Sequence, residues 1–162
     1  YVRSDTIESL QPLKGRVTAC LEGATSACGC SMESHWDDRP YADVRDNMAI
    51  VGSYVANMAS VGRTVTDPRV TGRKVLGSTD MGNVSYLMPS IHPMVKVAPE
   101  GVAIHTEDFA RYAGSDEGDR AAVDGALAMA LTVVDLWLDE GLRARAAAEF
   151  ATVSSTVDVL AR

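Results

Sequence analysis

A histidine between an expected strand and an expected helix is the first residue whose type and position suit chemistry. His105 stands in the run Ile104–Glu107, directly after a strand-like segment. Ligand-binding loops of α/β proteins gather at the carboxyl ends of strands, and an imidazole there is a candidate zinc ligand. The alternative is a residue that starts a helix or packs, because no second histidine stands two or four positions further on.

A polar loop upstream of this histidine is the second candidate. Gly77, Ser78 and Thr79 offer backbone N–H groups and hydroxyls that could cradle a substrate carboxylate or carbonyl. Asp80 either supports such a site or is a turn residue that bonds its own backbone. The loop lacks the Gly-Lys-Ser/Thr ending of a phosphate-binding loop.

The other two histidines carry weaker signals. His92 precedes Pro93, which favours an extended backbone, and it is either a substrate contact or a buried, hydrogen-bonded histidine. His35 lies on the polar side of an alternating segment, so we expect it to be solvated.

Three cysteines, Cys20, Cys28 and Cys30, fit neither a disulfide framework nor a structural zinc site. They are interpreted as small buried hydrophobes of a protein in the reducing cytoplasm.

Charge and composition exclude several classes of function. The chain has 162 residues, of which 15 are Lys or Arg and 22 are Asp or Glu, so the net charge is −7. This sign argues against binding to nucleic acid and to anionic membrane surfaces. The apolar stretch 121–138 is interrupted by Asp124 and Asp135 and predicts a buried helix rather than a membrane span. The chain opens without Met, which indicates processing or a piece of something longer.

The elements that must position the candidate residues alternate between strands and helices. Val44, Met48, Val51 and Val55 recur at helical spacing, whereas 93–98 alternates as a strand does. This mixture predicts an α/β or α+β fold. The expected elements are a strand end at 1–3, helices at about 6–26 and from 44 to 62, strands at 30–36 and 93–98, and helices at about 106–113, 119–139 and 142–150.

Several motifs in order resemble a known family. Gly77–Tyr86, Pro89–Pro93 and His105–Thr106 resemble the carboxyl-terminal part of the aminoacylase-like zinc amidohydrolases and dipeptidases, a family that includes carboxypeptidase G. The branch most like this chain splits β-alanyl-lysine and Xaa-Arg peptides.

The resemblance implies a fold and a domain organisation. The expected fold is α/β (α+β), with residues 1–37 as the end of a ferredoxin-like lid or dimerisation domain. Residues 41–162 would be the carboxyl-terminal part of a zinc-peptidase catalytic domain.

The resemblance also implies roles for individual residues. His105 matches the last ligand of a two-zinc centre, and Arg3 matches a lid arginine that approaches the substrate. The alternative for Arg3 is a surface residue of the expected strand. The loop Gly77, Ser78, Thr79 and Asp80 matches a segment that lines the substrate pocket. His92 matches a histidine of one branch, to which the resemblance gives no role.

The family's remaining zinc ligands and its general base stand upstream of the matched motifs and are absent from these 162 residues. The first hypothesis is therefore a fragment of a cytoplasmic, zinc-dependent amidohydrolase that hydrolyses a small dipeptide or N-acyl amino acid. It would act as a homodimer or together with a missing amino-terminal segment. The second hypothesis is a non-catalytic assembly module, and the third is a small α/β hydrolase that pairs Asp80 with His92.

Overall fold

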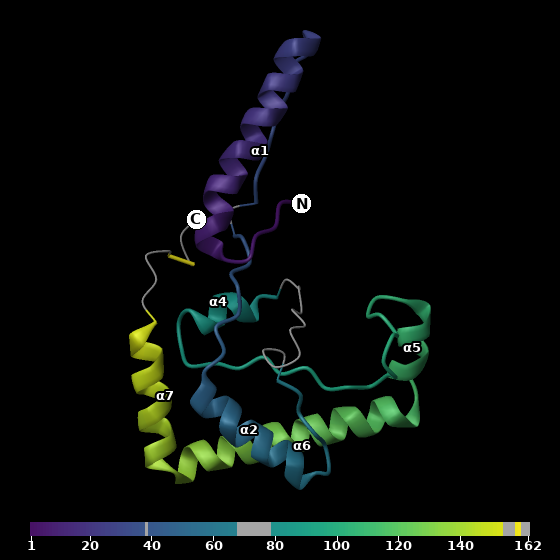
Figure 1. Ribbon diagram of the computed structural model, residues 1–162, viewed down its shortest axis with the longest axis vertical. Coiled ribbons are helices and arrows are strands. Elements are labelled where there is room, and N and C mark those ends of the chain that lie inside the picture. The colour runs from purple at the N-terminus through teal and green to yellow at the C-terminus, as the bar shows by residue number, and fades with distance from the viewer. Residues whose placement is uncertain (38, 68–78, 154–157, 160–162) are drawn as a thin grey trace. The chain divides into compact units, whose positions relative to one another are not determined.

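Six helices account for most of the residues that the structure describes. The computed structural model describes residues 1–37, 39–67, 79–153 and 158–159. The helices, shown in Figure 1, are α1 (Ile7–Cys28), α2 (Met48–Ser60), α4 (Met81–Ser85), α5 (Glu107–Ala113), α6 (Asp116–Leu138) and α7 (Glu140–Thr152).

The chain divides into two units, which are described one at a time. The first unit contains α1 and α4, and the second contains α2, α5, α6 and α7. The first is made of Tyr1–Arg45, Leu76–Met88 and Val153–Arg162, and the second of Asp46–Val75 and Pro89–Thr152.

The predicted α/β (α+β) fold, with a ferredoxin-like lid and an α/β catalytic domain, is wrong. The described residues contain no strand, and their one β-bridge is an isolated parallel pair of Asp46 and Ser90. The segment 93–98 shows why: Val95 is half-buried and its neighbour Lys96 is exposed, as the alternation predicts. A strand also needs a neighbouring backbone to receive its hydrogen bonds, and side-chain alternation does not specify that neighbour.

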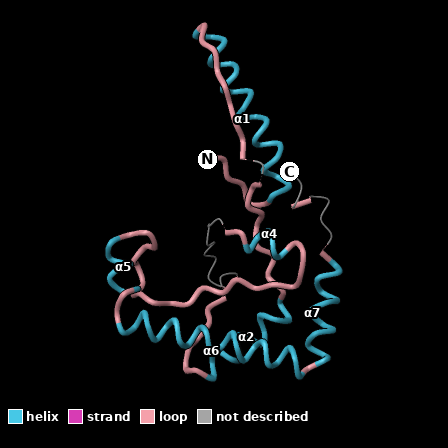
Figure 2. Tube along the Cα trace, turned by 180° about the vertical axis from the view of Figure 1, so that it is seen from behind, coloured by secondary structure: helices cyan, strands magenta, loops and turns pink. Residues whose placement is uncertain are grey.

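The first unit is organised by α1, which begins and ends at well-formed caps. The Thr6 side chain accepts a hydrogen bond from the Ser9 backbone N–H, and Gly29 ends the helix with φ of 67°. The following segment then runs back along α1 (Figure 2). Trp36 Nε1 donates to Thr18 Oγ1 at 3.2 Å, so side chains rather than a β-ladder hold the segment predicted as a strand.

The cysteines of this unit also differ from the prediction. Cys20, Cys28 and Cys30 are free and exposed, and the buried residue of α1 is Ile7 at its first position.

The second unit has its core between α2 and α6 (Figure 1). Tyr54 and Met58 of α2 pack with Ala128 of α6, which is completely buried. Val95 covers this cluster and closely approaches Gly125, where a side chain would meet it. The extended segment that contains Val95 is therefore held to the helices by packing.

The carboxyl-terminal helix α7 fixes the start of α2. The Glu149 carboxylate accepts hydrogen bonds from the backbone N–H groups of Met48 at 2.8 Å and Ala49 at 3.0 Å. Asn47, the N-cap residue, donates from its side chain to the carbonyl oxygen of Ala146 at 2.9 Å. A negative charge is favourable at a helix amino terminus, where N–H groups lack partners within the helix.

Candidate functional site

The segment with the family-like motif folds as helix α4, and its asparagine ties three backbone groups together. Asn83 Oδ1 accepts from the Ala42 N–H at 3.1 Å. Its Nδ2 donates to the carbonyl oxygens of Pro40 at 3.2 Å and Val159 at 3.3 Å. This side chain therefore holds α4 against segments that are remote in the sequence.

A buried serine and a glycine of α4 complete this attachment. Ser85 Oγ accepts from the Arg45 N–H at 3.0 Å and donates to the Gly82 carbonyl oxygen at 2.6 Å. A Cβ atom on Gly82 would overlap the carbonyl oxygen of Ala42. Glycine is required here for the close approach of two backbones.

The residue that follows α4 lies in a charged network. Tyr86 Oη donates to Asp43 Oδ1 at 2.9 Å, and the Ile7 N–H donates to the same oxygen at 3.0 Å. The Arg45 guanidinium lies 3.5 Å from the centre of the Tyr86 ring and pairs with Glu8 at 2.9 Å. Burial, and then the hydrogen bond to the Asp43 carboxylate, raise the pKa of Tyr86. The tyrosine is held neutral and serves as a hydrogen-bond donor.

The described part of the predicted substrate loop begins this helix. Gly77 and Ser78 lie outside the described residues. Thr79 Oγ1 accepts from the Met81 N–H at 3.3 Å, which is a local turn contact. Asp80 is exposed at the N-cap position of α4 and makes no capping hydrogen bond with its side chain. Its carboxylate faces solvent, where it is accessible to a ligand.

The structure places the predicted site residues in both units. Arg3, Thr79 and Asp80 belong to the first unit, whereas His92 and His105 belong to the second. Arg3 is exposed in the segment that leads into α1. The pairing of Asp80 with His92 stays a prediction.

His92 stands on an extended segment of the second unit. Its backbone N–H donates to Asp46 Oδ1 at 3.4 Å, and its side chain is exposed. Of the two interpretations from the sequence, the buried histidine is excluded, and an accessible imidazole remains.

His105 occupies a sharp turn directly before α5. In the part of the chain that the structure describes, it is the one non-glycine residue with positive φ, 64°. Thr106 then caps α5: its hydroxyl accepts from the Phe109 N–H at 3.2 Å and donates to the Ala103 carbonyl oxygen at 2.7 Å. A left-handed conformation is unfavourable for most residues and often marks functional positions. Here it occurs together with an exposed imidazole.

A zinc centre needs more than this histidine. Protein zinc sites use three or four nitrogen, sulfur or oxygen ligands. Among the described residues, no three His, Cys, Asp or Glu side chains are grouped so that they could hold a metal ion. The described residues do not fit a zinc centre by themselves, and the role of His105 as a zinc ligand stays a prediction.

A separate cavity of about 430 Å³ opens in the second unit where α2, α6 and α7 meet. None of the described site residues predicted from the sequence lines it. Its walls are formed by Met48, Ala49, Gly52, Ser53, Asp135, Asp139, Leu142 and Arg145.

Sequence reasoning missed the structural work of the motif. Ser85 and Tyr86 belong to the pattern, but the sequence does not indicate their partners Arg45 and Asp43. The available signal was a set of hydrogen-bonding side chains on a short segment with apolar neighbours. That signal shows that partners are needed, but it does not say which residues provide them.

Comparison with known proteins places the chain near one group of enzymes. No family model matches it. It is 29% identical over 136 residues to the Xaa-Arg dipeptidase of Mus musculus and 30% identical over 136 residues to that of Homo sapiens. Each match covers 84% of this chain and 31% of the relative, so the chain spans about a third of the length of these relatives. The similarity confirms the family resemblance of the motifs: over the matched residues, this chain is a homologue of the Xaa-Arg dipeptidases.

Proposed function

We propose that this chain is part of a dipeptidase-type hydrolase that cleaves the amide bond of a small dipeptide or N-acyl amino acid. The observation that carries the proposal is the similarity to two Xaa-Arg dipeptidases over 84% of the chain. Because the chain spans 31% of their length, the proposed activity belongs to a protein of dipeptidase length and not to these 162 residues alone.

Within such a protein, we propose that His105 supplies one zinc ligand and that the remaining ligands come from outside this chain. The exposed imidazole on a strained turn supports this role. Arg3, His92 and the loop 77–80 are proposed to face the substrate. The exposed side chains of Arg3, Asp80 and His92 are compatible with that assignment.

A second candidate function is a non-catalytic assembly module. It is favoured by the absence of a metal-binding group among the described residues. The two candidates predict the same behaviour for the isolated chain, namely no hydrolysis, but they differ once the chain belongs to a protein of dipeptidase length.

The location and the oligomeric state also belong to the proposal. Three free, exposed cysteines suit a reducing compartment and support the cytoplasm. A homodimer formed through residues 1–37 stays a prediction.

The test uses the human Xaa-Arg dipeptidase in which this chain replaces the 136 matched residues. We expect this exchange protein to bind zinc and to hydrolyse Xaa-Arg dipeptides, whereas the isolated chain does neither. The substitution His105→Ala should lower both zinc content and hydrolysis at least about tenfold, because a metal ligand is lost. Zinc is measured by elemental mass spectrometry and hydrolysis by release of arginine.

The control is His35→Ala, which removes another exposed imidazole and should change neither quantity. An exchange protein with normal helix content but without hydrolysis contradicts the dipeptidase proposal and favours the assembly module. Unchanged zinc in His105→Ala contradicts the ligand role of this residue.

A further inference from the structure

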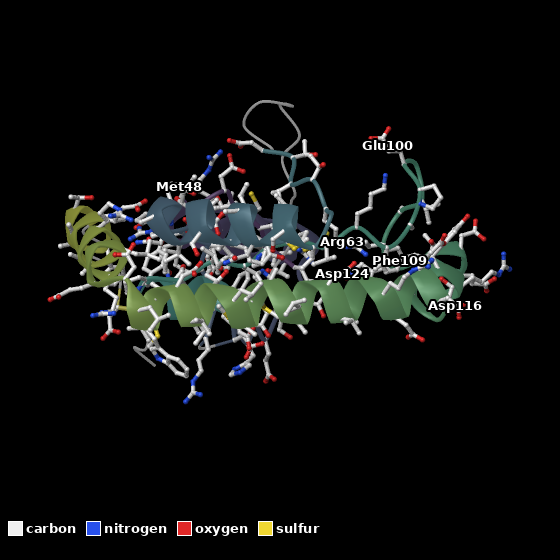
Figure 3. The ribbon with its side chains drawn as sticks, turned by 90° about the horizontal axis from the view of Figure 1, so that it is seen from below. Met48, Arg63, Glu100, Phe109, Asp116 and Asp124 are labelled. Carbon is white, nitrogen blue, oxygen red and sulfur yellow. The ribbon has the colours of Figure 1, made fainter. Side chains whose placement is uncertain are left out.

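Among the residues that the structure describes, helix α6 is covered on one side only. Its buried residues recur every three or four positions: Ala128 and Thr132 contact residues of α2, and Gly118 lies against the backbone at the end of α5. Figure 3 shows the covered side where Arg63 and Asp124 lie side by side. On the other side, side chains point away from α2. The buried residues are Gly118, Ala121, Gly125, Ala128 and Thr132.

The uncovered side carries large apolar residues. Trp137 is 74% exposed and Leu138 is 82% exposed. We call this surface the open face of α6; it consists of Val123, Leu127, Met129, Val134, Trp137 and Leu138. An apolar patch of this kind on a water-soluble unit marks an interaction site.

The open face also lacks charge. Between residues 121 and 138 the charged residues are Asp124 and Asp135. Asp124 accepts from Arg63 Nε at 2.7 Å, and Asp135 accepts from Ser53 Oγ at 2.7 Å and Asn57 Nδ2 at 2.8 Å. These hydrogen bonds, that from Ser53 first, lower the pKa of Asp135. Both carboxylates are therefore engaged on the side of α6 that faces the rest of its unit.

The breadth of the open face indicates the kind of partner. A helix that is apolar on both sides belongs in the core of a larger protein or in a membrane. A seam with one other helix would be a narrow stripe flanked by charged residues. Leu127 and Met129 are two positions apart and point in widely different directions on the helix surface. The open face thus fits a broad apolar layer better than one helix of a second copy.

We infer that the open face of α6 is the docking surface for the portion of a dipeptidase chain that lies outside the matched segment. The inference rests on the proposed function for the identity of the partner. Two observations support it: the open face is apolar, and the relatives are about three times as long as the segment they share with this chain. The layer would be supplied in the same polypeptide or by a separate one.

A lipid bilayer is the competing occupant. Helix α6 is long and apolar enough to cross a membrane by length and composition alone. The hydrogen bonds of Asp135 attach it to α2, and the ion pair of Asp124 with Arg63 attaches it to the turn that follows α2. A single isolated span would break these contacts and place two carboxylates in hydrocarbon.

The test pairs this chain with the human Xaa-Arg dipeptidase from which the 136 matched residues have been removed. The two polypeptides are produced together, and carbene labelling with mass spectrometry measures the exposure of the α6 peptide. We expect the chains to co-purify and labelling of α6 to fall at least threefold relative to this chain alone. Labelling of the α1 peptide serves as the internal reference and should not change.

Four results overturn the inference. They are separate elution of the two chains, unchanged labelling of α6, protection of α6 in the isolated chain by a homodimer seen in sedimentation, and protection of α6 by phosphatidylcholine vesicles. The last two identify a second copy or a membrane as the occupant.

Variants on the open face give a second measurement. Leu127→Glu and Trp137→Glu should reduce co-purification at least tenfold while the circular dichroism of the isolated chain stays unchanged, because both side chains are exposed. Leu127→Gln is the milder variant if a charge perturbs folding. The control Leu21→Glu changes an equally apolar, 45% exposed residue of α1 and should co-purify normally. Normal co-purification of Leu127→Glu overturns the inference.

This test is separable from that of the proposed function. If the two chains co-purify and α6 is protected, but the exchange protein does not hydrolyse dipeptides, the docking inference is supported and the dipeptidase proposal is contradicted. If the exchange protein hydrolyses dipeptides but the α6 peptide is not protected, the dipeptidase proposal is supported and the docking inference is contradicted.

Discussion

Helix α4 is held by polar side chains, whereas helix α6 is held on one side by apolar packing together with an ion pair and hydrogen bonds, and its other side exposes apolar residues. In α4, Asn83 and Ser85 bond to backbone groups far away in the sequence, and Tyr86 just after the helix bonds to Asp43. In α6, Ala128 is fully buried against α2, yet its neighbour Leu127 is 47% exposed. The polar side chains of the shorter helix bond to groups of their own unit. The longer helix packs against its unit on one side, and the apolar residues on its other side are exposed.

The difference changes how the two segments are interpreted. A polar motif that resembled a substrate loop does structural work in its described part; at its edge Thr79 makes a local turn contact and Asp80 is exposed. An apolar stretch that predicted a buried helix has one buried side and one side available for docking. Family-like motifs therefore do not by themselves separate residues that bind from residues that support.

The largest expected effect comes from placing a charge on each side of α6. Ala128→Asp puts an unpaired carboxylate beside Tyr54 and Met58 and should lower the free energy of unfolding of the second unit by about 4 kcal/mol. Leu127→Asp, on the open face, should change it by less than about 0.5 kcal/mol. Urea unfolding followed by hydrogen exchange of the α2 and α6 peptides measures both. Equal effects of the two substitutions would remove the distinction between the two sides.

The next effect tests whether backbone contact holds α4. Gly82→Ala introduces a Cβ that overlaps the Ala42 carbonyl oxygen, so the first unit should lose about 3 kcal/mol. Gly15→Ala is the control, because a Cβ at this position in α1 meets nothing within 4 Å. It should stabilise the unit by about 0.5–1 kcal/mol through helix propensity. Hydrogen exchange of peptides from α1 and α4 reports both changes, and an intact unit in Gly82→Ala would disprove the close approach.

A third prediction asks whether a polar clamp in the second unit is comparably important. Glu149→Ala removes the acceptor for two N–H groups at the start of α2 and should cost about 2 kcal/mol. Glu140→Ala, which removes an exposed carboxylate from the first turn of α7, should cost less than about 0.5 kcal/mol. Hydrogen exchange of the α2 backbone amides is measured in both variants. Similar protection in Glu149→Ala and Glu140→Ala would show that packing alone positions α2.

Local patterns predicted five of the six helices among the described residues, missed α4, and predicted strands that these residues do not form. The expected helix at 6–26 is observed as Ile7–Cys28, and that at 106–113 as Glu107–Ala113, because caps and apolar spacing are properties of neighbouring residues. The strand predicted at 93–98 failed because pairing depends on remote residues.

The candidate site shows the same limit. Its exposed imidazoles, His92 and His105, could be found from position in the chain, and the left-handed turn of His105 could not. Asn83 and Tyr86 were visible as polar residues, but their partners became identifiable only in three dimensions. The sequence shows which side chains can form hydrogen bonds, but the fold determines which groups are their partners.

The smallest expected effect compares the hydroxyls of the half-buried Tyr86 and the buried Tyr54. Tyr86→Phe removes the donor to Asp43 and should destabilise the first unit by about 1 kcal/mol. Tyr54→Phe, in the second unit, should be neutral or slightly stabilising, since the Tyr54 hydroxyl is buried with no hydrogen-bond partner among the described residues. Urea unfolding with hydrogen exchange of each unit measures the two changes, and a loss in Tyr54→Phe equal to that in Tyr86→Phe would contradict the assigned partners.

The dependence on pH sharpens this last comparison. Because the pKa of Tyr86 is raised above its ordinary value of 10.0, its contribution to stability is complete below pH 10 and is lost as pH rises further. The difference in unfolding free energy between the parent chain and Tyr86→Phe should therefore be constant from pH 7 to 9 and should narrow above pH 10. If the difference in unfolding free energy stays constant above pH 10 as well, the hydroxyl ionises equally well in the folded and unfolded chain. The hydrogen bond to Asp43 would then not be what holds Tyr86 beside Arg45.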